Sequence, residues 1–317
     1  MVDPKLSCGC PKKIIMELKS PVTYSSNITR LRSFDVETIK ALYIKETKVD
    51  VSRFFSGLTE IELYQCNDTG YRFYYPFTIY GDDKFYQDLN ELNSWYYQDN
   101  RWEHPLALTF LDRADKILEI GSGDGFFIKL CKKNNINDIT GLELNTAAAA
   151  KATQEGNIVH SETIQDHSAN HAGEYDVVCN FQVLEHIVDI RSFIESSLKV
   201  LKKGGKMIIA VPNNNPYLFE WDDYHTLNLP PHHAGLWNKT AFKNIEDVFS
   251  IKNTRSFTEP LGEMKHWFSV KINHTKKTNP LKAFFLSLIP SFIYKSYIKS
   301  NMDKIEGRNI LIVFEKN

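Results

Sequence analysis

Short continuous apolar runs alternate with helical spacings through the middle of the chain. Such runs are typical of buried parallel strands, and they occur at 117–120, 139–145, 157–160, 175–180 and 206–213. The segments between them, such as 147–155 and 191–201, place apolar residues at the three- and four-residue spacings of amphipathic helices. This order predicts an α/β fold, a Rossmann-like sheet with right-handed crossovers.

The flanking segments extend this pattern. Residues 309–316 form a last apolar run, expected to insert antiparallel beside 248–257 and to complete a seven-stranded, mostly parallel sheet with helices on both faces. Residues 61–81 alternate polar with aromatic or β-branched side chains around a turn, which predicts a β-hairpin. Residues 83–113 have helical spacing, and Pro105 is expected to break them into two helices.

These patterns predict two parts. Residues 1–82 are expected to form an amino-terminal accessory segment that contains β-hairpin structure and many aromatic residues. Residues 83–317 are expected to form the α/β domain. Within that domain, 213–240 is expected to be a loop on the substrate side, and 279–301 a helical insertion.

Three closely spaced glycines follow the first strand, at Gly121, Gly123 and Gly125. Glycine has no Cβ and adopts φ > 0 freely, so a ligand can lie directly on this backbone at the carboxyl edge of the sheet. A Walker loop would require Gly-Lys-Ser or Gly-Lys-Thr, which is absent, and a dinucleotide-binding turn would require glycine where Phe126 stands. The turn therefore predicts a different ligand.

Two acidic residues beside this turn indicate which ligand it is. Glu119 places a carboxylate next to the glycines, which disfavours a pyrophosphate and suits a cation. Glu143 ends the second strand, 18 residues after Gly125, where a carboxylate can accept hydrogen bonds from both ribose hydroxyls. S-Adenosylmethionine carries an ammonium and a sulfonium and no phosphate, so we predict it as the cofactor. The alternative for Glu143 is a surface glutamate at a strand end.

The remaining cofactor contacts follow from the order of the strands. Thr163 and Ile164 lie just past the third strand, at the level of the adenine ring, and the backbone carbonyls of Asn180 and Phe181 are expected to face the methionine ammonium. The full predicted set is Glu119, Gly121, Ser122, Gly123, Gly125, Glu143, Leu144, Thr163, Ile164, Asn180, Phe181 and Gln182.

Histidines supply the candidate catalytic groups. Pro230-Pro231 fixes an extended loop in LNLPPHHAGLWN (227–238), and His232 and His233 follow directly. An alcohol must lose a proton as it attacks a sulfonium methyl group, and histidine has the nearest suitable pKa. We predict His232, His233 and His186 as catalytic residues. The alternative is that one loop histidine packs while the other hydrogen-bonds the loop backbone.

Composition and charge narrow the class of protein. The 317 residues include 38 basic and 39 acidic side chains, a net charge of −1, so no surface for nucleic acid is indicated. The first residues lack the apolar core of a signal peptide, and no run of about 18 apolar residues occurs, which predicts a cytoplasmic protein. Five scattered cysteines argue against a disulfide framework.

No metal site is predicted from the sequence. Cys8, Cys10 and Cys66 resemble the remnant of a zinc knuckle, but zinc requires four ligands and the spacing fails. A magnesium site is one interpretation of the oxygen-bearing side chains of Asn213–Asn215, Asp222 and Asp223. A solvated loop that hydrogen-bonds a polyol accounts for the same residues and is the interpretation that we favour.

Residues 279–301 have a strongly apolar face, with Pro290 in the middle and three lysines. The segment is too short and too charged to span a bilayer. We expect it to cap the pocket or to form a homodimer face, and peripheral contact with a membrane surface is the alternative.

Residues 83–257 resemble class I S-adenosylmethionine-dependent methyltransferases, in the broad bacterial group described as methyltransferase domain 23 or type 11. The matching stretches are WYYQDNRWEHPLAL, ILEIGSGDG, GLELN, YDVVCNFQVLEHI, LKKGGKMIIAVPNN and LNLPPHHAGLWN. The resemblance implies methyl transfer and leaves the substrate open, since members often modify sugars, nucleotide sugars, cell-surface glycans and small metabolites.

Three functions therefore remain. The first, which we favour, is methyl transfer to a hydroxyl of a sugar, a glycan or another small polar metabolite. The second is C-methylation of a nucleotide-linked keto sugar, in which a histidine removes a proton next to the carbonyl. The third is a cofactor-binding scaffold that has lost catalysis.

Overall fold

The computed structural model describes residues 18–93, 101–214, 221–302 and 304–317, and a seven-stranded sheet lies at its centre. The strand order is β10-β11-β8-β7-β4-β5-β6. Strands β4 to β8 run parallel, whereas β11 is antiparallel to both β8 and β10, which confirms the predicted fold class. The bounds are β4 (Ile117–Ile120), β5 (Ile139–Leu142), β6 (Ile158–His160), β7 (Tyr175–Phe181), β8 (Leu201–Pro212), β10 (Ile251–Pro260) and β11 (Glu306–Lys316).

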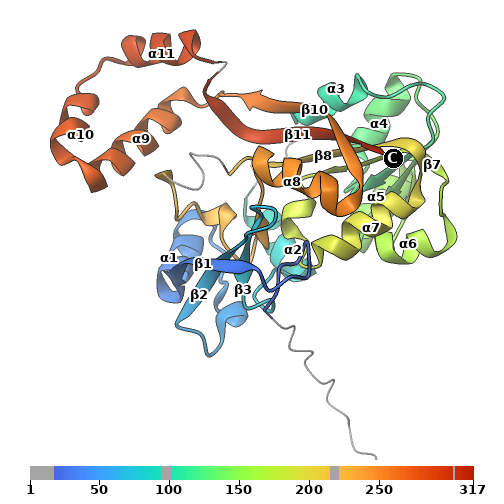
Figure 1. Ribbon diagram of the computed structural model, residues 1–317, viewed down its shortest axis with the longest axis horizontal. Coiled ribbons are helices and arrows are strands. Elements are labelled where there is room, and N and C mark those ends of the chain that lie inside the picture. Colours follow the sequence, from blue (N-terminus) through green and yellow to red (C-terminus); the bar gives the residue numbers. More distant parts are fainter. Residues whose placement is uncertain (1–17, 94–100, 215–220, 303) are drawn as a thin grey trace, which may run out of the picture.

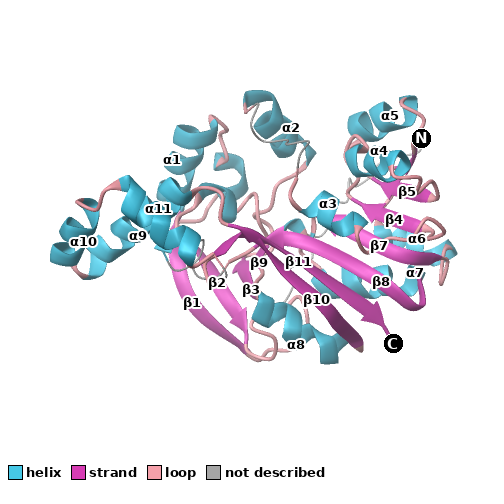
Figure 2. Cartoon of the chain, turned by 90° about the horizontal axis from the view of Figure 1, so that it is seen from above, coloured by secondary structure: helices cyan, strands magenta, loops and turns pink. Residues whose placement is uncertain are grey.

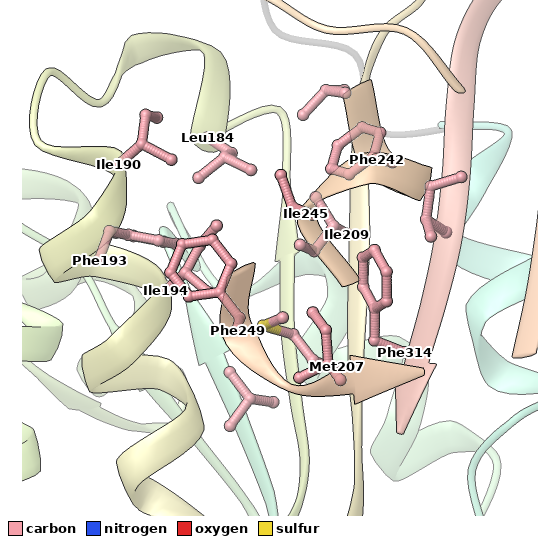
Figure 3. Close-up of a cluster of buried hydrophobic side chains, with 14 of the residues drawn as sticks. Leu184, Ile190, Phe193, Ile194, Met207, Ile209, Phe242, Ile245, Phe249 and Phe314 are labelled. Atoms are coloured by element: carbon pink, nitrogen blue, oxygen red, sulfur yellow. The ribbon is translucent and has the colours of Figure 1, made fainter. Parts of the chain in front are cut away.

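Helices cover both faces of this sheet (Figure 2). One face carries α3 (Glu103–Leu108), α4 (Phe126–Lys133) and α5 (Thr146–Gln154), and the other carries α6 (Ile164–Asn170), α7 (Ile190–Val200) and α8 (Lys239–Phe249). On the second face, Phe193 and Ile194 of α7 and Phe242 of α8 pack over Met207 and Ile209 of β8 (Figure 3). Full burial of each such side chain stabilises the folded state by about 1.5–3 kcal/mol. The helices packed on both faces therefore hold the sheet edge, where the glycine turn lies, in a fixed position.

A smaller antiparallel sheet precedes the large one in the chain and has the order β1-β2-β3-β9. Its strands are β1 (Ile28–Asp35), β2 (Glu60–Cys66), β3 (Arg72–Tyr75) and β9 (Gly235–Leu236), accompanied by α1 (Val36–Thr47) and the short 3₁₀ helix η1 (Ser52–Phe55). The β2–β3 pairing confirms the predicted hairpin. Strand β9 comes from the 213–240 loop, and Tyr71 shares a hydrophobic cluster with Trp237, so the accessory segment is packed onto the α/β part. The division at residue 82 stays a prediction.

The position of the break in the 83–113 helical pattern differs from the prediction. Two helices are present, α2 (Asp83–Leu92) and α3, but Pro105 is the third residue of α3 rather than the point of interruption. The first turn of a helix has unpaired N–H groups in any case, so proline is tolerated there. The expectation that Pro105 separates the helices was therefore wrong.

The predicted helical insertion forms part of an arm that extends away from the sheet (Figure 1). The arm comprises α9 (Met264–Thr278), α10 (Pro280–Ser287) and α11 (Ser291–Ser300). Trp267 of α9 packs on Trp221, and Lys277 forms an ion pair with Asp223 at 3.1 Å. Across the described parts of the chain, no helix combines the length and apolar character that crossing a membrane requires.

Candidate active site

The glycine turn between β4 and α4 has the backbone conformation expected of it. Gly121, Gly123 and Gly125 have φ values of 75°, 53° and 79°, in the left-handed region that side chains disfavour. A Cβ on Gly121 would overlap Val183, and one on Gly125 would lie 2.9 Å from Asn157 Nδ2. A Cβ on Gly123 would meet no atom within 4 Å, so this glycine faces open space where a ligand can lie on the backbone.

Glu143 holds the turn from the end of β5. Its Oε2 accepts a hydrogen bond from the Gly123 N–H at 2.8 Å, and its Oε1 accepts one from the Asn145 N–H at 2.7 Å. Burial raises the pKa of this carboxyl, while these backbone hydrogen bonds oppose the shift. Each carboxylate oxygen has a second acceptor position, so both ribose hydroxyls can still donate to Glu143.

Glu119 lies in strand β4, two residues before Gly121, and is 4% exposed. Among the residues that the structure describes, no hydrogen-bond partner reaches its Oε2. Burial raises the pKa of this carboxyl well above its usual value, and the nearby Glu143 charge adds to the shift. A buried carboxyl with an unused oxygen favours a cationic ligand, because the cation supplies the interaction that burial removes.

Two adjoining cavities lie along this sheet edge, with volumes of about 620 and 690 Å³. Both are lined by Gly121, Gly123 and Glu143, so they meet over the glycine turn. All the predicted cofactor residues line one or both cavities except two. Gly125 caps α4, and Asn180 is fully buried in β7 with both side-chain amide atoms lacking a partner in the described structure.

The first cavity ends against three histidines from two segments. His186 belongs to the 3₁₀ helix η2 (Leu184–His186), and His232 and His233 follow the 3₁₀ helix η4 (Thr226–Asn228). One ring nitrogen of each lies within 4.8 Å of those of the other two. The structure thus brings the three predicted catalytic histidines together, and their roles stay predictions.

Hydrogen bonds orient each imidazole. The Nδ1–H of His232 donates to Leu227 O at 2.7 Å, and that of His186 donates to His232 O at 2.6 Å. His233 Nδ1 lies 3.1 Å from Asn228 Oδ1, whose amide group donates in turn to Asn214. Burial and the neighbouring histidines lower the pKa of His232 and His233 well below the usual value, and burial lowers the pKa of His186 to about 4, so all three rings are neutral at pH 7.

Comparison with known proteins relates the central part of this chain to a known domain family. The model of the methyltransferase domain family matches residues 94–250, the stretch that contains the glycine turn, Glu143 and the three histidines. This match covers just under half of the chain, and it identifies the large sheet and its helices as a class I S-adenosylmethionine-dependent methyltransferase fold.

Curated relatives match about a third of this chain. A ubiquinone biosynthesis O-methyltransferase of Cronobacter sakazakii is 33% identical over 125 residues, which cover 35% of this chain and 51% of the relative. The enzyme of the same name from Vibrio parahaemolyticus is 34% identical over 130 residues, which cover 37% of this chain and 55% of the relative. The chain thus spans about half the length of the curated relatives it matches.

Solved structures similar to this chain include an S-adenosylmethionine-dependent methyltransferase from Archaeoglobus fulgidus. It has 16% sequence identity and a TM-score of 0.49, and the match covers 68% of this chain and 91% of that one. A putative sarcosine dimethylglycine methyltransferase from Galdieria sulphuraria has 14% identity and a TM-score of 0.46, and the match covers 75% of this chain and 92% of that one.

Two residues of the site, Tyr86 and Arg101, were not predicted from the sequence, whereas the sequence places a third, Glu185, beside His186 over the reacting centre. Tyr86 of α2 donates a hydrogen bond to His232 O at 3.1 Å, and its hydroxyl lies 3.1 Å from His186 Nδ1. Arg101 lines both cavities and lies 3.8 Å from Glu103. Glu185 is 2% exposed, its Oε2 has no partner among the described residues, and burial raises its pKa to about 8. Arg101 stands in a stretch that carries the family resemblance, but no spacing indicated that it faces a cavity.

Proposed function

We propose that the protein transfers the methyl group of S-adenosylmethionine to a hydroxyl of a small polar molecule, with a sugar or glycan as the favoured class of acceptor. The observation that carries this proposal is the continuity of the first cavity. It reaches from the Glu143-held glycine turn, at the cofactor end, to His186, His232 and His233 at the other.

The residues of the two cavities suit the parts of the cofactor. Glu143 accepts hydrogen bonds from the ribose hydroxyls, and Leu144 and Ile164 flank the adenine ring. The buried carboxyl of Glu119 compensates the ammonium group, and the Arg101 guanidinium, which lines both cavities, pairs with the cofactor's carboxylate. Within this proposal, Phe181 and Gln182 border the methyl group on the acceptor side.

The histidine end of the cavity activates the acceptor. A hydroxyl placed there attacks the methyl carbon as its proton is withdrawn by the histidine cluster. Holding oxygen, methyl carbon and sulfur in line can supply roughly 7–11 kcal/mol of the barrier reduction, so positioning contributes alongside proton removal. The O-methyltransferase names of the matched relatives support oxygen as the methylated atom.

The test is methyl transfer to a panel of hydroxyl acceptors that includes free sugars, nucleotide sugars, glycans and phenols. Mass spectrometry follows the gain of one methyl group in the acceptor and the release of S-adenosylhomocysteine. Glu143→Ala should lose activity by at least about a hundredfold, since it removes two charge-assisted contacts of about 1.5–3 kcal/mol each. Glu155→Ala, which removes a half-exposed glutamate paired only with Lys129 in the described structure, is the matched control and should retain activity.

Cofactor binding without turnover on any acceptor would favour the scaffold function instead. Activity that is confined to carbon acceptors would favour C-methylation.

A further inference from the structure

We propose that His186, His232 and His233 bind a divalent transition-metal cation at the acceptor end of the cavity, with the Glu185 carboxylate beside it. This inference rests on the proposed function and deepens it, because the bound cation would activate the acceptor hydroxyl in place of direct proton removal by the histidines. It differs from the sequence-based expectation that the chain has no metal site.

Three imidazoles on two separate segments converge at one point. A ring nitrogen of each lies within 4.8 Å of the other two, and the ring centroids of His232 and His233 are 4.5 Å apart. Zinc–nitrogen bonds of about 2.0–2.1 Å place tetrahedral ligands about 3.3 Å apart, so the rings need to approach by at most about 1.5 Å.

The hydrogen bonds of the cluster are those of metal-binding histidines. In all three rings Nδ1 faces an oxygen acceptor: Leu227 O for His232, His232 O for His186 and Asn228 Oδ1 for His233. An Nδ1–H donated to an oxygen fixes the neutral tautomer, in which Nε2 carries the lone pair that binds a metal. The outer contacts therefore prepare the three Nε2 atoms as ligands.

Glu185 supplies a second, independent observation. Its side chain is 98% removed from solvent, since only 2% of the residue is exposed, and it lines the same cavity. Oε1 lies 3.9 Å from His186 Nε2, and Oε2 has no hydrogen-bond partner in the part of the chain that the structure describes. Burying a carboxylate in this way is costly, and a cation held by the three histidines would offset that cost.

The ligand set selects the class of metal. Imidazole suits zinc, iron, nickel and copper, whereas magnesium and calcium prefer oxygen ligands. The net charge of a divalent cation with three neutral imidazoles and the nearby Glu185 carboxylate is +1. This positive charge favours an oxyanion in the coordination position that the protein leaves open.

The proposed chemistry uses that position for the acceptor. The cation lowers the pKa of the coordinated hydroxyl, as it does for bound water, and the O–H proton passes to water in the open cavity. The oxygen then forms a bond to the methyl carbon while the carbon–sulfur bond breaks. Its electron pair stays on sulfur, so the products are a methyl ether and neutral S-adenosylhomocysteine.

Zinc uptake by the full chain tests the site directly. The protein is stripped with a chelator, and zinc is then titrated by calorimetry with metal content checked by mass spectrometry. We expect one zinc per chain for the wild type and none for His233→Ala or His232→Gln. Asn228→Ala, which removes the acceptor that orients His233, should weaken zinc binding by about 10–100-fold. His160→Ala, an exposed histidine outside the cluster, is the control and should bind as the wild type does.

Cobalt substitution gives a readout that does not depend on turnover. Cobalt should produce the visible absorption of a four-coordinate site in the wild type and in His160→Ala, and this band should be absent from His233→Ala. Far-ultraviolet circular dichroism establishes whether each variant is folded. Should a folded His233→Ala bind zinc as tightly as the wild type, the metal site is overturned.

S-Adenosylhomocysteine binding to the same samples separates this inference from the proposed function. Zinc-free protein that binds S-adenosylhomocysteine and transfers methyl groups equally well with and without added zinc would overturn the metal site and leave the methyltransferase intact. Failure to bind S-adenosylhomocysteine, whatever the zinc content, would overturn the proposed function.

Discussion

Glu119 is a buried acid that we expect to change its proton occupancy when the cofactor binds. Burial and the Glu143 charge raise its pKa, whereas the cofactor's ammonium group stabilises the carboxylate and lowers it. Binding should therefore release a proton wherever the free protein carries one. Affinity for S-adenosylhomocysteine should rise with pH up to the pKa of Glu119 in the free protein and level off above it.

Calorimetry in buffers with different ionisation enthalpies measures this proton release. Glu119→Gln should weaken binding and abolish the release, because glutamine has no proton to lose. Equal proton release by Glu119→Gln and the wild type would show that another group is responsible.

Gly123 is the turn residue whose substitution separates ligand binding from stability. Gly123→Ala creates no clash in the ligand-free protein, but the left-handed backbone costs about 1–2 kcal/mol with a side chain. Its Cβ would occupy space where the cofactor lies, so affinity for S-adenosylhomocysteine should fall at least about tenfold.

Gly173→Ala is the matched control for Gly123→Ala. Gly173 has a φ of 68°, also has no atom within 4 Å of an added Cβ, and lines neither cavity. It should show a similar loss in the free energy of unfolding and unchanged cofactor affinity. Equal affinity of the two variants would mean that the cofactor does not approach Gly123.

At the scale of elements, helix α2 supports the histidine loop through Tyr86. Tyr86→Phe removes the hydrogen bond to His232 O and should cost about 1 kcal/mol of stability. Methyl transfer should slow because His186 and His232 lose part of their support, whereas S-adenosylhomocysteine affinity should not change. Turnover and calorimetry measure the two effects separately, and Tyr297→Phe, at an exposed position on α11, is the control.

The elements that the sequence predicted well are those with a local signal. The apolar runs at 117–120 and 175–180 are long enough to define strands, and the three glycines after the first of them define the turn at the sheet edge from neighbouring residues alone. Strand β9 has only two residues and pairs with β3 across more than half the chain, so periodicity cannot reveal it. Tyr86 and Arg101 reach the site through tertiary contacts, which a linear pattern does not encode.

At the scale of the whole molecule, the arm formed by α9–α11 is separate from the site. No residue of the arm lines either cavity, so the described structure gives no support to its expected role as a cap over the pocket. Its exposed apolar side chains are Leu281, Phe284, Phe285, Leu288, Phe292, Ile293 and Tyr297. Contact with a second copy therefore remains our prediction for this face, and contact with a membrane surface is the alternative.

The double variant Phe284→Ser/Phe292→Ser tests the role of the arm. These side chains are 57% and 72% exposed, so each change should alter the free energy of unfolding by no more than about 0.5 kcal/mol and leave cofactor binding unchanged. Light scattering should show a dimer for the wild type and a monomer for the variant. A monomeric wild type that binds anionic vesicles, with binding lost in the variant, would support the membrane alternative.

The central claim is that the Glu143-held glycine turn binds S-adenosylmethionine. Calorimetric titration of S-adenosylhomocysteine into the full chain and into Glu143→Ala tests it most directly. We predict one ligand per chain for the wild type and an affinity at least about a hundredfold lower for the variant, whose carboxylate no longer meets the ribose. No binding by the wild type, or equal binding by both proteins, would contradict the account.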